Sequence, residues 1–511
     1  MSEDANTFIP TFYSHRSVFI TGGTGFLGKA LCEKLLRSCP NIKEIFLLIR
    51  PKKGQTINDR LKKMLENKLF DLLRRERPNS FEKIIPISGD VSREDLGLLS
   101  EDRKMLSENV SIIFHVAASV RFDESLKDAI FTNLRSTRDI CILAQSMKNI
   151  VALLHVSSTY TQSDKAIVDE VLYPLEDVDW RKTIKIAETI DDEILKIFTA
   201  KYIGTMANTY VFTKRLAEQV INDFSESLPC IILRPSIVVS SVNDPVPGWI
   251  DNFNGPMGML IGGGTGLLRV IYADSSITCD FIPVDLVIKA MIIVVWKRGI
   301  QNFSEDNSLQ IYNCSVHNTK SISLGQLIRV GFRAVYDIPL ERTIWKPQTI
   351  MTNSSLLYYI LVLVLHIVPA LLIDAVLKIL RLRPMLLKLQ QKIYISNRAI
   401  SYFVTHFWQF NNTNLINIFE NLSAANEKDF GYKNSLNFDI EEFLRRGIIG
   451  SKLYLLNEDM SPLEQARVLR HSKRTTLEQE TLRNVRSVYT QSDQIEVDEV
   501  IYPSLEDVEK V

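Results

Sequence analysis

Hydrophobic and polar positions in the first part of the chain follow two alternating patterns. Short runs of β-branched and other apolar residues alternate with longer amphipathic stretches, such as Gly28–Ser38 and Asp128–Ser146. The short runs predict six strands: Ser17–Thr21, Glu44–Ile49, Lys83–Ser88, Ser111–His115, Val151–Ser157 and Cys230–Leu233. Strands that alternate with helices indicate an α/β fold with a doubly wound parallel sheet.

The pattern changes between Pro245 and Gly266, where proline, glycine, tryptophan and asparagine residues follow one another without periodicity. The segment also carries Trp249 and several apolar residues, which a simple linker does not need. We therefore expect a long functional loop here.

The longest hydrophobic run in the chain is Leu356–Ile373, which reads LLYYILVLVLHIVPALLI. Its eighteen residues are just enough to span a bilayer, although His366 and Pro369 interrupt the run and Asp374 ends it. Basic residues follow on the far side: Lys378, Arg381, Arg383, Lys388 and Lys392. The length favours membrane association, as a single short span or an embedded hairpin; a buried helix of a soluble domain is the alternative.

One segment occurs twice. Ser158–Pro174 and Ser487–Pro503 match at twelve of seventeen positions, and LEDV follows both copies, after the inserted Ser504 in the second. No repeat architecture places two copies so far apart. We interpret the second copy as a duplicated exon or fused fragment. Its polar and acidic composition predicts that the region 486–511 is disordered or loosely attached and dispensable for activity.

Composition limits the possible function. The 511 residues are too many for one ordinary domain, and 60 basic residues balance 60 acidic ones, which gives no general attraction to nucleic acid. The six cysteines form no CxxC pair and the seven histidines no HExxH motif, so reduced thiols are expected and a metal site is not. The acidic start MSEDANTFIP is unlike a secretory signal.

A glycine motif follows the first predicted strand. The sequence TGGTGFLG spaces Gly22, Gly25 and Gly28 as GxxGxxG and then enters a predicted helix. Such a turn is tight, lets the backbone approach a pyrophosphate, and points free helix N–H groups at it. It predicts a Rossmann-like dinucleotide site that includes Thr21, Gly22, Gly25, Phe26, Leu27 and Gly28.

The second strand indicates which dinucleotide is bound. NAD-specific sites place an acid at its end, whereas here the strand ends in Arg50 and two lysines. A guanidinium can hold a 2′-phosphate, which favours NADPH. By their positions at strand ends, Asp90 and Val91 should meet the adenine, and Ala117 and the adjacent alanine should leave room for ribose and nicotinamide.

A candidate catalytic group lies on the predicted helix Thr205–Phe224. Tyr210 and Lys214 are four residues apart and therefore share one face of that helix. A nearby ammonium should lower the pKa of the phenol, so that it exchanges protons near neutral pH. The strand before this helix ends in hydroxyl residues, of which Ser158 could hydrogen-bond a substrate oxygen.

The motifs TGGTGFLG, HVAASVRF, VSSTY, YVFTK and LRPSIV, in this order, resemble those of extended short-chain dehydrogenases/reductases over roughly Ser17 to Val295. GWIDNFNGP (Gly248–Pro256) and the stretch from Ala370 to Asp459 resemble the alcohol-forming fatty acyl-CoA reductases. The resemblance implies that NADPH reduces a long-chain acyl-CoA to a primary alcohol through an aldehyde, with release of coenzyme A. It implies Tyr210 as proton donor, Lys214 as ribose ligand, and Ser158 as the group that binds the carbonyl oxygen.

The resemblance also suggests an organisation. We expect a reductase domain over residues 1–345, a hydrophobic membrane-associated segment over 346–374, a mostly helical domain over 370–459 and the duplicated tail over 486–511. The protein should face the cytosol at a peroxisomal or endoplasmic reticulum membrane.

The chain departs from the family pattern at two places. VSSTY stands where VSTAY is usual, which keeps a hydroxyl at Ser158, and the usual second hydrophobic stretch near the C-terminus is absent. Two kinds of alternative remain. One is another extended short-chain reductase, such as a sterol dehydrogenase, an aldehyde-forming reductase or a sugar-nucleotide epimerase, and the other is a catalytically silent membrane scaffold. Arg50 argues against the epimerase, because epimerases prefer an acid there. Intact Tyr210 and Lys214 argue against the scaffold.

Overall fold

A parallel sheet of seven strands organises the N-terminal part of this computed structural model, which describes residues 8–301, 303, 306–316, 322–341, 343–432 and 438–460. The strand order is β11-β7-β5-β4-β1-β2-β3, and every pairing is parallel. The strands are β1 (Ser17–Thr21), β2 (Glu44–Ile49), β3 (Ile84–Ser88), β4 (Val110–His115), β5 (Ala152–Val156), β7 (Cys230–Pro235) and β11 (Gln310–Cys314). The predicted doubly wound α/β fold is confirmed.

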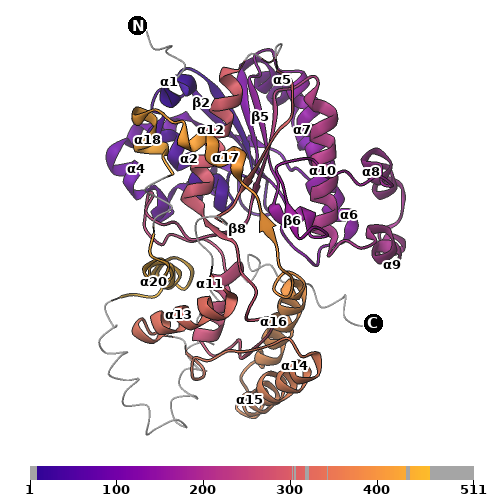
Figure 1. The fold of residues 1–511 in the computed structure, drawn as a ribbon, viewed down its shortest axis with the longest axis vertical. Helices are drawn as coiled ribbons and strands as arrows, with labels where there is room; N and C mark the ends of the chain where they lie inside the picture. Colours follow the sequence, from indigo (N-terminus) through magenta and orange to yellow (C-terminus); the bar gives the residue numbers. More distant parts are fainter. Residues whose placement is uncertain are drawn as a thin grey trace.

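Helices cover both faces of this sheet (Figure 1). One face packs on α5 (Ser100–Asn109), α6 (Leu126–Ala129), α7 (Ser136–Gln145), α8 (Trp180–Thr189) and α10 (Thr209–Ser225), with α9 (Asp192–Ile203) beside α6. The other packs on α1 (Ile9–Tyr13), α2 (Phe26–Ser38), α3 (Ile57–Leu65), α4 (Asp71–Glu76), α12 (Val284–Ile300), α17 (Thr413–Glu420) and α18 (Ala424–Phe430). The strands are buried on both sides, which explains their nearly continuous apolar sequences.

A second body lies beyond the carboxyl ends of the strands (Figure 1). Its helices are α11 (Gly255–Gly264), α13 (Leu324–Asp337), α14 (Ser355–Val362), α15 (Val368–Ile379), α16 (Leu386–Ser401) and α20 (Ile440–Gly450). Short parallel pairs accompany them: β8 (Ile237–Val239) with β10 (Phe281–Pro283), β9 (Val270–Tyr272) with β12 (Ile350–Thr352), and β6 (Ile167–Val168) with β13 (Gln409–Phe410).

Three predictions of local structure were incomplete. The strand β11 was not anticipated, and the predicted helix Asp128–Ser146 is α6, the π-helical segment Ile130–Arg135 and α7 in succession. The predicted loop from Pro245 to Gly266 contains the helix α11, which begins with proline in its first turn and buries Met257 and Leu260. Because its glycines have low helix propensity, the sequence pattern did not predict this helix.

The C-terminal part of the chain returns to the first core. Leu415, Phe419 and Phe430 belong to the same buried cluster as the strands β1 and β2, next to α12. The N- and C-terminal parts therefore share one hydrophobic core. The duplicated segment 486–511 lies outside the described residues.

The hydrophobic run forms one continuous helix. α14, a π-helical turn (Leu363–Ile367) and α15 together extend over Ser355–Ile379. His366 and Pro369 do not break this helix, because the π-turn precedes the proline and the proline lies in the first turn of α15. It is the one helix of the described residues that is long and apolar enough to cross a membrane.

Candidate active site

The glycine turn forms an open backbone cradle between β1 and α2. Gly22 has φ +72°, and a Cβ atom there would lie 2.7 Å from the backbone nitrogen of Ala117. Gly25 precedes α2, and no side chain of the described residues caps this helix, so its first N–H groups can bind an anion. The turn therefore fits the pyrophosphate of a dinucleotide.

Thr21 joins two strand ends beneath this turn. Its hydroxyl lies 2.8 Å from Nδ1 of His115, at the end of β4, and accepts the backbone N–H of Ala117 at 3.2 Å. Ala117 itself is partly exposed. Thr21 therefore holds the edge of the turn against the end of β4.

Asp90 and Val91 follow β3 at the same edge of the sheet. The carboxylate of Asp90 accepts hydrogen bonds from the backbone and the hydroxyl of Ser92, at 3.0 and 2.8 Å. These bonds fix the loop, and both residues are partly exposed.

Arg50 is exposed and directly follows β2. A second guanidinium lies close to it, because Arg60 of α3 donates a hydrogen bond to the carbonyl oxygen of Arg50. Arg60 was not predicted from the sequence, since its proximity to Arg50 depends on how α3 folds back over the end of β2. Two cations at this position increase the positive charge available to a phosphate.

Tyr210 and Lys214 lie in the first two turns of α10 and face the end of β5. The side chain of Asn208 caps α10 by accepting the N–H of Val211 at 2.9 Å. Lys214 Nζ donates to the carbonyl oxygen of Val156 at 2.6 Å and lies 3.3 Å from Nε2 of His155. Two residues beyond Val156 is Ser158, whose hydroxyl faces Tyr210. The three predicted catalytic residues are thus brought together.

Burial sets the protonation of this group. It raises the pKa of Tyr210 to about 12, although hydrogen bonding to Ser158 acts in the opposite direction. Burial also lowers the pKa of Lys214 to about 7, while the charge of Glu218 favours the ammonium. The expected lowering of the Tyr210 pKa by Lys214 was wrong. The ammonium instead bonds to the end of β5, and the phenol keeps its proton.

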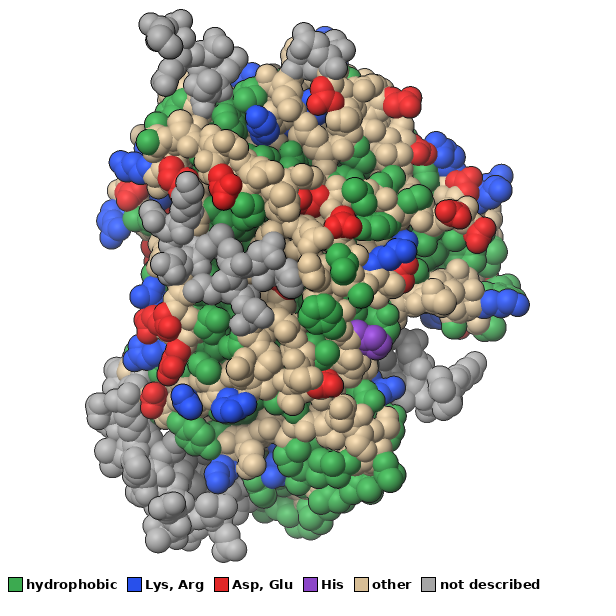
Figure 2. Space-filling view, viewed as in Figure 1, with side chains coloured by type: hydrophobic (Ala, Val, Ile, Leu, Met, Phe, Trp, Pro, Cys, Tyr) green, Lys and Arg blue, Asp and Glu red, His purple; other side chains and the backbone are tan. Residues whose placement is uncertain are grey.

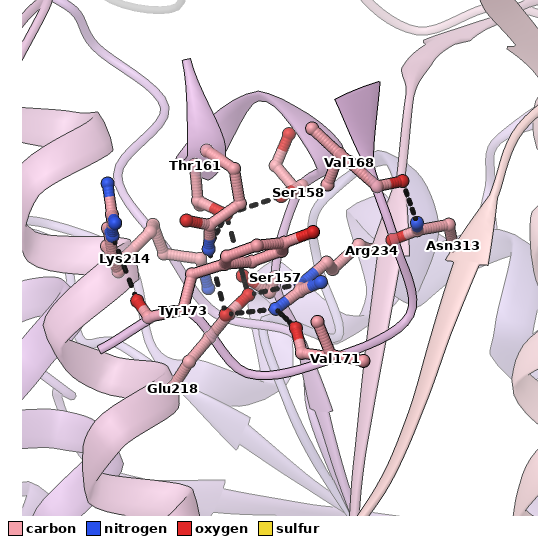
Figure 3. Close-up of polar contacts among 12 residues, drawn as sticks. Ser157, Ser158, Thr161, Val168, Val171, Tyr173, Lys214, Glu218, Arg234 and Asn313 are labelled. Atoms are coloured by element: carbon pink, nitrogen blue, oxygen red, sulfur yellow. Dashed lines mark hydrogen bonds and ion pairs between the residues drawn. The ribbon is translucent and has the colours of Figure 1, made fainter. Parts of the chain in front are cut away.

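A buried ion pair holds the strand end and the helix in register (Figure 3). Arg234 of β7 and Glu218 of α10 are 0% and 1% exposed, and they form two hydrogen bonds of 2.8 and 2.7 Å. Glu218 also accepts from Ser157 at 2.6 Å and from Gln162 at 3.2 Å. The pair therefore fixes the backbone next to Ser158 against the helix that carries Tyr210 and Lys214.

This pair was not predicted from the sequence as part of the site. Glu218 lies four residues after Lys214 on the same helix face, and Arg234 is the arginine of the LRPSIV motif, so both signals were present. The pairing itself could not be predicted from the sequence, because it joins a helix and a strand through the interior of the fold.

Aromatic rings extend from Tyr210 toward the C-terminal body. The ring centroid of Phe122 is 5.7 Å from that of Tyr210 and 5.2 Å from that of Phe403, which follows α16. Phe403 also meets Tyr160 edge to face at 5.5 Å. An apolar substrate group beside Tyr210 would therefore contact residues from both halves of the chain.

The GWIDNFNGP segment packs on the cofactor turn. Trp249 stacks on Phe26 with ring centroids 5.1 Å apart, and Asp251 pairs with Lys29 of α2 at 2.7 Å. Trp249 is 1% exposed and also donates to Asn67 at 3.2 Å. The ring of Phe26 thus anchors this segment against the glycine turn.

Comparison with known proteins agrees with this geometry. Residues 20–291 match the NAD-binding domain, and residues 365–458 the Sterile domain, of the family described as male sterility protein. The chain is 39% identical to fatty acyl-CoA reductase 1 of Xenopus laevis over 464 residues, which are 90% of this chain and 88% of that protein. It is 38% identical to fatty acyl-CoA reductase 1 of Homo sapiens over the same shares.

Solved structures support the fold. The reductase domain of a nonribosomal peptide synthetase from Mycobacterium tuberculosis has a TM-score of 0.57 at 15% identity, covering 89% of this chain and 97% of that one. The terminal R domain of the myxalamid pathway has a TM-score of 0.56 at 18% identity, covering 87% and 93%. With the family match over most of its length, the chain belongs to the fatty acyl-CoA reductase family of NAD-binding oxidoreductases.

Proposed function

We propose that this protein reduces long-chain fatty acyl-CoA to a primary fatty alcohol with NADPH, through an aldehyde intermediate and with release of coenzyme A. The observation that carries the proposal is the meeting of Tyr210, Lys214 and Ser158 at the carboxyl end of β5, close to the glycine turn. The names of the curated relatives supply the substrate class.

The residues divide the chemistry between them. Two molecules of NADPH, bound one after the other, would each supply one hydride: the first to the thioester carbonyl, which then expels coenzyme A to leave the aldehyde, and the second to the aldehyde. Ser158 donates a hydrogen bond to the carbonyl oxygen as negative charge develops on it. Tyr210 gives its proton to that oxygen, and its raised pKa keeps the proton in place until the oxygen becomes basic enough to take it.

The cofactor would be held by backbone and charge. The turn of Gly22, Gly25 and Gly28 receives the pyrophosphate, and Lys214 binds the nicotinamide ribose. Arg50, with Arg60 beside it, receives the 2′-phosphate that distinguishes NADPH from NADH. Asp90, Val91 and Ala117 complete the adenine and ribose contacts.

We further propose a location on the cytosolic side of a peroxisomal or endoplasmic reticulum membrane. The apolar helix Ser355–Ile379 provides the membrane contact, and the six described cysteines are all free and buried, which suits a reducing compartment. We also retain the division into a reductase part (1–345), a membrane-associated segment (346–374) and a helical C-terminal part (370–459).

The test is direct product analysis. Purified protein is incubated with NADPH or NADH and a series of acyl-CoA thioesters of increasing chain length, and the lipid products are separated and identified. We expect primary alcohols, more from NADPH than from NADH and more from long chains than from short ones. Free aldehyde as the final product would support a two-electron reductase instead, and no product with any thioester would contradict the proposal.

A further inference from the structure

The helix Ser355–Ile379 is not a core helix. It has 25 residues, and only 22% of its most apolar window is buried. A helix this apolar would be almost wholly buried if its role were to fill the interior of a soluble domain. Its outward residues therefore need another explanation.

One side of this helix is attached to the protein body along its whole length. The buried side chains are those of Tyr358, Val362, His366, Ala370 and Leu377, mostly four residues apart. This spacing keeps them on a single face. The helix is therefore docked lengthwise.

Polar contacts fix this docked side. Nε2 of His366 accepts the backbone N–H groups of Arg269 and Val270, both at 3.1 Å, and its Nδ1 lies 2.7 Å from Oε1 of Gln390. Asp374 accepts three backbone N–H groups at the start of α16, at 2.9 to 3.1 Å. A helix that crossed a bilayer would lose these bonds and bury the freed groups in hydrocarbon, at a cost of several kcal/mol each.

The opposite side presents a continuous apolar face, which we call the outer face and which forms the broad apolar area at the lower end of the molecule in Figure 2. Isolated exposed apolar residues are ordinary, but a contiguous set of this kind marks an interaction surface. The outer face consists of Leu356, Leu357, Tyr359, Ile360, Leu363, Val364, Val368, Leu371, Leu372, Val376, Ile379 and Leu380, each 43% to 80% exposed.

Basic residues border the outer face at its C-terminal end. Lys378, Arg381, Arg383 and Lys388 are all exposed there. The one acid between residues 355 and 388 is Asp374, whose carboxylate is engaged by α16. An apolar face with a positive edge matches an anionic lipid surface, in which acyl chains lie beneath negative headgroups.

We propose that the helix Ser355–Ile379 lies in the plane of one membrane leaflet, with its outer face among the acyl chains, and that it does not cross the bilayer. This proposal rests on the membrane association proposed above. It also relates the membrane to the site: α16 packs against α15 and leads to Phe403, whose ring contacts Phe122 beside Tyr210. An acyl chain that leaves the leaflet thus has apolar residues between it and the catalytic tyrosine.

Flotation of the full-length protein with vesicles tests the contact. Vesicles of phosphatidylcholine with phosphatidylserine are compared with vesicles of phosphatidylcholine alone. Wild type should float with both and more strongly with phosphatidylserine. Leu363→Glu with Leu371→Glu should reduce binding about tenfold or more, because each acid removes a buried leucine from the leaflet. The matched control is Ile197→Glu on α9, where the isoleucine is 78% exposed, and it should float like wild type.

Three outcomes would overturn the proposal. Unchanged flotation of the double variant would show that the outer face is not the lipid contact. A dimer in the absence of vesicles that the double variant dissociates would assign the face to a second copy of the chain. Absence of flotation in wild type would reject membrane association as well, while alcohol formation by the same sample would leave the proposed reductase activity standing.

Depth measurement separates a helix in the plane from a spanning one. Leu356→Cys, Val368→Cys and Ile379→Cys place single labels at the start, middle and end of the helix, and the native cysteines of the described residues are buried. Fluorescence quenching by lipids with nitroxides at different depths then locates each label. We expect all three labels at one shallow depth. A deep middle label between two shallow end labels would show a span and overturn the proposal.

Discussion

Two regions of the molecule reverse the usual placement of residues. Charged side chains are buried behind the active site, and apolar side chains are exposed on the outer face of the helix Ser355–Ile379. The interior encloses the charges of Glu218 and Arg234, which are 1% and 0% exposed, whereas the helix leaves Leu356 73% exposed to solvent. The two buried charges are fully hydrogen-bonded to partners within the protein. The exposed leucine side chains, in contrast, are not covered by other described residues. The interior region is thus satisfied by contacts within the chain, whereas the outer face needs a partner to cover its apolar surface.

This difference predicts that the two regions fail in different ways. Changes in the interior should reduce turnover or stability in any assay, with or without lipid. Changes on the outer face should affect only lipid binding and reactions that depend on it. For Tyr210, Arg50 and Lys214, a variant of an exposed residue of the same type serves as the control.

The largest effect is expected at Tyr210. Tyr210→Phe removes only the hydroxyl, so packing should survive while turnover with acyl-CoA falls by about 10²–10⁴-fold. Steady-state rates of NADPH oxidation measure this. Tyr359→Phe removes the same hydroxyl from the outer face and should keep normal turnover. Near-normal turnover of Tyr210→Phe would remove the proposed role of this residue.

The next effect concerns stability. Glu218→Leu leaves the Arg234 guanidinium buried without its carboxylate and should lower the free energy of unfolding by about 3–5 kcal/mol. Urea titration measures the loss. Adding Arg234→Met should restore part of it, because no uncompensated charge then remains. A single variant as stable as wild type would show that the pair does not hold α10 against β7.

Glu218 and Arg234 also illustrate the limit of what could be predicted from the sequence. The glycine turn, Tyr210, Lys214 and Ser158 were predictable because each belongs to a local pattern of strand, turn or helix face. Glu218 with Arg234, and Phe122 with Phe403, were not, since their contacts join segments that only the folded chain brings together. The helix α11 was missed for a local reason: its glycines lower helix propensity, and only tertiary packing stabilises it.

A smaller effect is expected for cofactor choice at the surface. Arg50→Ala should cost about 1.5–3 kcal/mol in NADPH binding, because one charge-assisted phosphate contact is lost. The Michaelis constant for NADPH should rise roughly ten- to hundredfold, with that for NADH nearly unchanged. Arg75→Ala removes an exposed arginine elsewhere and serves as the control. Equal effects of Arg50→Ala on both cofactors would contradict a 2′-phosphate contact.

The smallest effect depends on pH. Burial lowers the pKa of Lys214 from 10.5 to about 7. Below pH 7 the lysine is charged in the folded protein, and burying this charge lowers the free energy of unfolding by its full amount. Between pH 7 and 10.5 the folded lysine is neutral while the unfolded chain stays protonated. The free-energy cost of burying the lysine therefore falls as the pH rises. Compared with Lys214→Met, wild type should therefore lose roughly a few degrees in melting temperature when the pH moves from alkaline to below 7.

Melting curves of wild type and Lys214→Met across this pH range measure the difference between the two proteins. Lys201→Met, on the exposed end of α9, is the matched control and should show no such trend. A difference that stays constant with pH would mean that the lysine does not carry a lowered pKa in the folded protein.

The central claim is that one site, built around Tyr210, Lys214 and Ser158, delivers two hydrides from NADPH to the same carbon. NADPH with deuterium at both positions of the nicotinamide C4 tests it most directly. Incubation with a long-chain acyl-CoA, followed by mass spectrometry of the lipid product, should give a primary alcohol with two deuterium atoms at C1. An alcohol with one deuterium or none, or an aldehyde as the end product, would contradict the account.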